Sequence, residues 1–257
     1  MKKTLIVANW KMNLNTHEAS VLVHRLHQSI QTHRSVEVVL APNMLALQPI
    51  SVELDRHKFK LAAQNAFYQD HGPYTGEVSF NMLRDLVDYV MIGHSERRTY
   101  FDETFEVVQK KVAAAVRNGI QPIICIGETK QERLDGETKQ VLHDQLVTAL
   151  FRLTSEEIIE SVIAYEPVWA IGTGDPEKPS DIAKAVSWIR HNIAELYGGK
   201  VAEEVRVIYG ASVEPDYVSG ILAVPGVDGF LVGGASLNYQ KFAGIVDAAY
   251  KVQHEKE

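Results

Sequence analysis

The chain has 257 residues, of which 46% are hydrophobic and 23% are charged, a composition typical of globular proteins and not of disordered or fibrous ones. Its net charge of -7 argues against a nucleic-acid-binding or anionic-membrane-binding surface. A single cysteine, Cys125, excludes a disulfide framework, and the short apolar run near the start is too short for a signal sequence or a membrane span, so we expect a cytoplasmic protein.

Eight short apolar runs rich in β-branched residues recur along the chain. Each run is continuously apolar, which is typical of parallel strands that are covered on both faces. In chain order the runs are TLIVANW, VEVVLAP, FKLAAQN, DYVMIGH, QPIICIG, SVIAYEP, VRVIYG and GFLVGG. Cys125 lies inside the fifth run and is expected to be a small buried hydrophobic residue.

Segments with helical spacing alternate with these runs. We expect helices over residues 17–32, 44–55, 79–86, 104–118, 138–150, 180–197, 214–223 and 238–254. Thr104 and Ser180-Asp181 are expected to cap helix starts, and Asn118-Gly119 and Gly198-Gly199 are expected to end helices. The stretch QDHGPYTGE is expected to be a long loop.

Strand followed by helix, eight times and without a linker or a break in composition, predicts an α/β fold with one domain over residues 1–257. The fold is a single (β/α)8 barrel, or TIM barrel. The alternative is an open doubly wound sheet. Such a sheet normally has a G-x-G-x-x-G turn after its first strand, where this chain has NWKMN.

Polar side chains and glycines follow most of the expected strands. All strands of such a barrel point the same way, so residues just past the strands converge on one face, where barrel enzymes build their sites. These residues are Asn9, Lys11, Gln64, Asn65, His94, Ser95, Glu96, Glu128, Glu166, Gly210, Ala211, Ser212, Gly233 and Gly234. One rim therefore collects a cation, an imidazole, carboxylates and two glycine-rich turns.

The residue types indicate possible chemistry, and each has a structural alternative. Glu166, at the end of an apolar strand and next to Pro167, is either a desolvated base or a buried ion-pair partner. Lys11 is either a fixed positive charge or a solvated loop residue. His94 precedes SERR, which can open a short helix, and amides at a helix start favour a neutral imidazole. The alternative is an ordinary hydrogen-bonded histidine.

Two glycine-rich turns, YGAS and LVGGAS, each lead into a helical segment after the seventh and eighth strands. That is where barrels usually bind phosphate through backbone amides. Glu96 and Glu166 could indicate glycoside hydrolysis, but little aromatic material lies at these strand ends. His24 and His27 lie one helical turn apart without an evident third ligand, so no metal site is expected.

Seven sequence blocks resemble the triosephosphate isomerase family, in order and across essentially the whole chain. They are ANWKMN (8–13), AAQN (62–65), TGEVS (75–79), IGHSERR (92–98), CIGE (125–128), AYEPVWAIGTG (164–174) and DGFLVGGASL (228–237). The resemblance implies the same barrel and the interconversion of glyceraldehyde 3-phosphate and dihydroxyacetone phosphate through an enediol, without cofactor or metal. It also implies a homodimer in which the third loop carries Thr75 into a neighbouring subunit.

The resemblance also implies roles for individual residues. Glu166 would be the base, His94 the neutral electrophile, and Lys11 with Asn9 the groups that bind substrate and stabilise negative charge. Glu96 would pair with the lysine and complete the catalytic set. The phosphate would be held at Gly172, Ser212, Gly233 and Gly234.

The family's mobile lid would run from Pro167 to about Glu177 and close over the phosphate. It would exclude water and prevent loss of phosphate from the enediol. Ile171 and Leu231 would cover the carboxylate, and Trp169 would bond with Tyr165 and Glu128. The lid residues are Pro167, Trp169, Ile171, Gly174, Pro176 and Glu177.

The chain departs from the family pattern in three places. Asp175-Pro176-Glu177 stands where the family commonly has lysine and small residues, and Pro73 stands in the third loop. Ala211 replaces the second glycine of YGGS, at a cost of about 1 kcal/mol if that position needs a positive φ. The altered end of the lid and Ala211 keep open an isomerase of a four-carbon ketose phosphate. A barrel retained only for binding is the further alternative.

Overall fold

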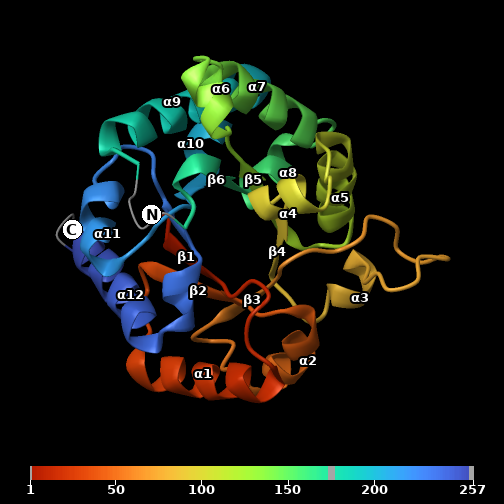
Figure 1. Ribbon diagram of the computed structural model, residues 1–257, viewed down its shortest axis with the longest axis vertical. Helices are drawn as coiled ribbons and strands as arrows, with labels where there is room; N and C mark the ends of the chain where they lie inside the picture. Colours follow the sequence, from red (N-terminus) through yellow and green to blue (C-terminus); the bar gives the residue numbers. More distant parts are fainter. Residues whose placement is uncertain (1, 173–176, 255–257) are drawn as a thin grey trace.

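The computed structural model describes residues 2–172 and 177–254. Within this part of the chain, eight parallel strands close into a barrel in the order β1 to β8 (Figure 1), which confirms the predicted α/β TIM barrel. The strands are β1 (Thr4–Asn9), β2 (Val36–Ala41), β3 (Lys60–Ala63), β4 (Tyr89–Ile92), β5 (Gln121–Ile126), β6 (Val162–Tyr165), β7 (Arg206–Tyr209) and β8 (Gly229–Val232).

Helices surround the barrel on its outside (Figure 1). They are α1 (Thr16–Ser29), α2 (Met44–Glu53), α3 (Phe80–Leu83), α4 (Ser95–Tyr100), α5 (Phe105–Arg117), α6 (Lys130–Leu134), α7 (Thr138–Ala149), α8 (Ser155–Glu160), α9 (Pro179–Tyr197), α10 (Gly199–Glu204), α11 (Pro215–Leu222) and α12 (Tyr239–His254), with short 3₁₀ helices η1 (Val168–Ala170) and η2 (Gly234–Leu237). No helix of the described residues is long and apolar enough to cross a membrane.

Three predictions about helix ends were wrong. The helix expected to start at Ser180-Asp181 is α9, which starts at Pro179 without a side-chain cap. Proline suits the first helical position because it presets φ and lacks an N–H that would have no partner within the helix. Gly198, with φ of 91°, ends α9, but Gly199 begins α10 instead of helping to end a helix. The third helix is α3, and it is shorter than expected.

Two short helices that the sequence analysis left out have readable start signals. In α6 the side chain of Thr129 accepts from the backbone of Glu132, whose side chain accepts from the backbone of Thr129. Thr154 and Glu157 form the same reciprocal capping box at α8. The pattern T-x-x-E is a recognisable signature of a helix start, and α6 carries a residue that matters below.

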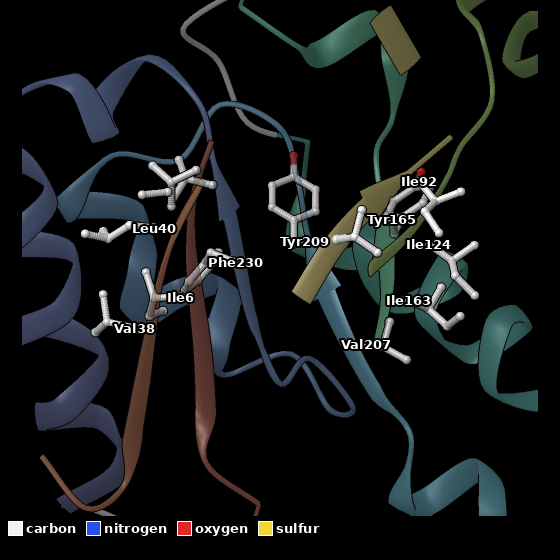
Figure 2. Close-up of a cluster of buried hydrophobic side chains, with 14 of the residues drawn as sticks. Ile6, Val38, Leu40, Ile92, Ile124, Ile163, Tyr165, Val207, Tyr209 and Phe230 are labelled. Atoms are coloured by element: carbon white, nitrogen blue, oxygen red, sulfur yellow. The ribbon is translucent and has the colours of Figure 1, made fainter. Parts of the chain in front are cut away.

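Alternating residues of each strand face opposite sides of the barrel wall. Leu5, Val7 and Cys125 belong to a cluster drawn only from strands, which fills the barrel interior. Ile6 and Ala8 belong to a larger cluster that includes helix residues and lies between the strands and the helices. Figure 2 shows part of this outer cluster, including Ile6, Val38, Leu40 and Phe230. Because both faces of the strands are buried, their continuous apolar runs are accounted for.

The loop between β3 and α3, expected as a long irregular segment, extends outward from the barrel (Figure 1). It contains Thr75, which is exposed, and Tyr74, which is 40% exposed. The carboxyl ends of the strands are thereby flanked on one side by a protruding loop.

Candidate active site

A cavity of about 480 Å³ lies at the carboxyl ends of the strands. Most residues singled out from the sequence line it, whereas Glu96 lines an adjoining cavity of about 350 Å³ that shares Asn9, Lys11 and His94. The first cavity is lined by Asn9, Lys11, His94, Glu166, Ile171, Gly172, Gly210, Ala211, Ser212, Val213, Glu214, Leu231, Gly233, Gly234, Ala235, Asn238 and Lys241.

Glu166 follows β6 directly and is 1% exposed. Its backbone N–H donates to the carbonyl of Ile126 at 2.7 Å, so the β5–β6 ladder continues through the residue. At Gly127 a Cβ would lie 1.8 Å from the Glu166 carbonyl oxygen, which means that only glycine allows this approach. The backbone of the carboxylate-bearing residue is therefore fixed by its two neighbouring strand ends.

The carboxylate of Glu166 contacts the start of α4. Oε2 accepts from the backbone N–H of Ser95 at 3.0 Å, and Oε1 lies 3.1 Å from Nε2 of His94. Both donors belong to the turn that follows β4. In this arrangement the carboxylate and the imidazole are bonded to each other at one side of the cavity.

His94 is the N-cap of α4 and is 7% exposed. Its Nδ1 accepts from the backbone N–H of Glu96 at 3.2 Å. A nitrogen that accepts carries no proton, so the neutral ring has its proton on Nε2, which faces the cavity. The short helix expected after His94 thus fixes the tautomer as a hydrogen-bond donor.

Lys11 has a left-handed backbone, with φ of 52°. Its N–H donates to Oδ1 of Asn9 at 3.0 Å, and its carbonyl accepts from Nε2 of Gln64 at 2.9 Å. These two bonds hold a conformation that costs a non-glycine residue about 1–3 kcal/mol. The ammonium forms an ion pair with Glu96, and a Cβ at Gly233 would lie 3.8 Å from Nζ, so the cation reaches the last glycine-rich turn.

The two glycine-rich turns lie beside each other on the cavity wall. Gly233 precedes η2, which Gly234 begins, and the Ser212 hydroxyl donates to the carbonyl of Ala170 at 3.0 Å. Ala211 does not have a positive φ, since the non-glycine residues with positive φ in the described ranges are Lys11, Leu14, Asp102 and Arg152. The conditional penalty for alanine at this position therefore does not apply.

The segment after β6 is described from Pro167 to Gly172 and again at Glu177; Gly174 and Pro176 lie outside the described residues. Ile171 and Leu231 line the same cavity as Glu166. Nε1 of Trp169 donates to Oε1 of Glu128 at 3.1 Å.

The hydroxyl of Tyr165, the other expected partner of Trp169, instead contacts Glu128 and Glu177. The backbone N–H of Glu177 donates to the hydroxyl of Tyr209 at 3.0 Å.

A buried ionic cluster behind His94 was not predicted from the sequence. Glu103 accepts from the backbone N–H of Gly93 at 3.2 Å and from Nε of Arg97 at 2.7 Å, and it also pairs with Lys111. Burial lowers the pKa of Lys111. Burial alone would raise the pKa of Glu103, but the positive charges of Lys111 and Arg97 bring the pKa of Glu103 below its ordinary value. Lys111 was detectable as a cation within the apolar stripe of α5.

Arg98 was also missed. It donates to the carbonyls of Cys125 at 3.0 Å and Gly127 at 3.2 Å, which joins the end of β5 to α4. Burial raises the pKa of the Cys125 thiol well above its ordinary value. Among the residues that the structure describes, no group of three or more His, Cys, Asp or Glu side chains is placed to hold a metal ion.

Comparison with known proteins gives one consistent result. The family model described as "Triosephosphate isomerase" matches residues 4–249. The chain is 42% identical to the triosephosphate isomerase of Dehalococcoides mccartyi over 255 residues, which cover 99% of this chain and 100% of that protein. It is 45% identical to that of Caldanaerobacter subterraneus over 248 residues (96% and 100%) and 45% identical to that of Citrifermentans bemidjiense over 247 residues (96% and 98%).

Proposed function

The chain belongs to the triosephosphate isomerase family and interconverts D-glyceraldehyde 3-phosphate and dihydroxyacetone phosphate; from this premise we propose that Glu166 is the base that moves the proton between C1 and C2. The observation that carries the assignment is the buried carboxylate at a cavity wall, within hydrogen-bond reach of a histidine that donates. The family match does not favour the four-carbon alternative.

The bond between Glu166 and His94 suggests the order of events. A substrate carbonyl competes for the Nε2 proton of His94, and when it takes this bond it releases one carboxylate oxygen. The carboxylate then removes the proton from the carbon next to the carbonyl. The electron pair of the broken C–H bond forms the C=C bond of the enediolate, and the carbonyl oxygen takes the negative charge. A proton then passes from the hydroxyl oxygen on the neighbouring carbon to the negatively charged oxygen. Return of the first proton from Glu166 to the former carbonyl carbon completes the isomerisation.

Lys11 and Asn9 bind the substrate oxygens in this proposal, and Lys11 stabilises the charge that develops on them. Glu96 keeps the ammonium in position through their ion pair. A cation that is already held in place needs no reorganisation when the enediolate forms, and this is the source of its catalytic value.

The phosphate is assigned to the turns that follow β6, β7 and β8. Gly172, Ser212, Gly233 and Gly234 line one end of the cavity, and glycine-rich turns that lead into helices offer backbone N–H groups to anions. The segment from Pro167 to Glu177 is proposed as a lid over this end. Support comes from Ile171 and Gly172 in the cavity wall.

The protein is further proposed to be a cytoplasmic homodimer. The adjoining cavity of about 350 Å³ reaches Lys11 and contains Met12, which is 95% exposed, and Phe101, which is 66% exposed. An exposed apolar rim of this kind favours a protein contact. The loop that carries Thr75 from a second copy is its proposed occupant, and Thr75→Arg is then expected to shift the sedimentation coefficient to that of a monomer.

The catalytic assignment is tested by measuring the turnover rate of glyceraldehyde 3-phosphate without added metal. The wild type is compared with Glu166→Gln and Glu203→Gln. Glu203 is exposed on α10, so its variant is a matched change of carboxylate to amide. Loss of general-base catalysis costs about 10²–10⁴-fold. We expect kcat to fall by about that factor in Glu166→Gln only. Retained kcat in the folded Glu166→Gln protein would contradict the assignment.

A further inference from the structure

A buried cluster behind the cavity joins the two ends of the segment from Pro167 to Glu177. At the first end, Trp169 donates to Glu128, which is fully buried. At the second end, the side chain of Glu177 is 1% exposed, and its Oε1 accepts from Arg133 of α6 at 2.6 Å. Arg133 also approaches Glu128 at 3.4 Å. The two carboxylates thus share one guanidinium.

The hydroxyl of Tyr165 lies between the same two carboxylates. Its oxygen is 3.2 Å from Oε2 of Glu128 and 3.1 Å from Oε2 of Glu177. A phenol has one proton and can donate to only one of these oxygens at a time. If both carboxylates are ionised, one of these two short oxygen–oxygen contacts has no proton between its oxygens and is therefore not a hydrogen bond. A proton on one of them completes both hydrogen bonds.

The charges around the cluster lead to the same conclusion. Arg133 is the cation in contact with the pair, and it also bonds Asp181 of α9 at 3.0 Å. Asp181 also pairs with Lys184 at 3.0 Å, so it has a second cation, whereas the two buried carboxylates share the guanidinium of Arg133. Tyr209 faces the backbone of Glu177 and stays neutral, because burial raises the pKa of its hydroxyl. Like charges at such distance disfavour double ionisation.

We propose that Glu177 is a positioning residue for the isomerase. In its neutral form it ties the end of the loop before α9 to the same Glu128 carboxylate that holds Trp169, and ionisation of Glu177 weakens this tie. The proposal rests on the proposed function of the segment as a lid. Under this proposal, the glutamate that departs from the family pattern at position 177 helps to hold the end of the loop. An alanine or another small residue there would lack this role.

The direction of the pH effect follows from burial, which raises the pKa of Glu177 from 4.5 to about 7. The loop end is docked when the Glu177 side chain lies in the buried cluster. A carboxyl group whose pKa is raised in this docked position stabilises docking fully below pH 4.5. This contribution is lost progressively as the pH rises to about 7. Each pKa unit changes the equilibrium constant for docking about tenfold, so ionisation of Glu177 weakens docking by about a few hundredfold at most.

The direct experiment follows Trp169 fluorescence in the substrate-free protein from pH 5 to 9. Arg133 stacks on the Trp169 ring at 4.5 Å, so the indole reports on the cluster. We expect one transition near pH 7 in the wild type and in the matched variant Glu203→Gln, and none in Glu177→Gln, whose amide stays neutral. Wild-type fluorescence without a transition, or the same transition in Glu177→Gln, would overturn the proposal.

Kinetics provide a second readout, the phosphate released per turnover, which a purely structural role of Glu177 would not change. An exposed enediolate expels inorganic phosphate, its electron pair forming a new C=C bond, and the product tautomerises to methylglyoxal. Phosphate release per turnover is therefore expected to rise several-fold above pH 7 in the wild type but to stay low in Glu177→Gln. In Glu177→Ala, which lacks the tie, we expect high release at every pH.

The ionisation of the substrate phosphate near pH 6 is common to all variants, so comparing their phosphate release at the same pH removes its effect. Equal phosphate release in Glu177→Gln, Glu177→Ala and wild type at pH 8.5 would contradict the proposal. The fluorescence transition needs no turnover. A protein without isomerase activity would therefore fail the kinetic test of function while still reporting on Glu177.

Discussion

Gly210, the residue after β7, packs against Glu166, the proposed base, closely enough that one added methyl group should slow the reaction. A Cβ at this position would lie 3.2 Å from Cγ of Glu166 and 3.2 Å from Cβ of Leu231. Carbon atoms pack best at about 3.5–4.0 Å, so the Glu166 side chain, Leu231 or the Gly210 backbone must move by roughly 0.3–0.8 Å. The φ of Gly210 lies outside the left-handed region, so alanine causes no backbone strain there.

A displacement of about 1 Å at a reacting group can cost about 100-fold in rate, so we expect Gly210→Ala to lower kcat by about 10-fold or more. KM should change less than kcat, because the proposed phosphate positions Ser212, Gly233 and Gly234 are not among the groups nearest to the added Cβ. Gly220→Ala is the matched control, since a Cβ at Gly220, inside α11, meets nothing within 4 Å. Steady-state kinetics at one pH and a thermal melt of both variants suffice. Unchanged kcat in Gly210→Ala would refute the packing argument, and a rise in KM alone would show that the phosphate site had moved instead.

Three further predictions concern charged and buried groups outside the base. Glu103→Gln removes the buried ion-pair partner of Lys111, whose ammonium keeps its bond to Oδ1 of Asn65 at 2.7 Å, so urea denaturation should show a loss of about 3–5 kcal/mol, partly restored by adding Lys111→Met. Because the pKa of Glu103 is lowered in the fold, its stabilising contribution is present above its ordinary pKa and is lost as the pH falls through the folded value. Lys241→Met, at the cavity wall, should raise KM several-fold at low ionic strength and less at 0.15 M salt, whereas exposed Lys200→Met should not. Cys125 should resist thiol reagents at pH 8 until the protein is unfolded, which a chromogenic disulfide reagent measures.

The convergence of Asn9, Lys11, His94 and Glu166 on one cavity could be predicted from the sequence. The prediction needed only the strand ends and the rule that parallel strands point the same way. Short side chains directly after a strand have little freedom to point elsewhere. The short helix after His94 could also be predicted, since SERR reads as a helix start.

The cluster that contains Glu128, Arg133 and Glu177 could not be predicted in the same way. Glu128 and Arg133 follow β5, whereas Glu177 follows β6, and which of their side chains meet depends on the stagger of the barrel. The helix that carries Arg133 had a readable capping signal, but nothing in the sequence fixed the direction of its side chain. The left-handed backbone of Lys11 was equally hidden, because a lysine gives no indication of a positive φ.

The site thus has two layers, a first around Glu166 and His94 and a second around the cluster that contains Glu177. This division explains how the chain keeps the family's chemical residues while it diverges at the end of the proposed lid. Glu166 and His94 are held by strand ends and by the start of α4, and none of the bonds described for their side chains involves Glu177. The end of the proposed lid is held by the second layer, where Glu177 contacts Tyr165, Tyr209 and Arg133. A substitution in the second layer therefore changes how the loop is held without displacing the base. Selection on loop position can then act separately from selection on the reaction, and a carboxyl group in this layer makes loop position depend on pH.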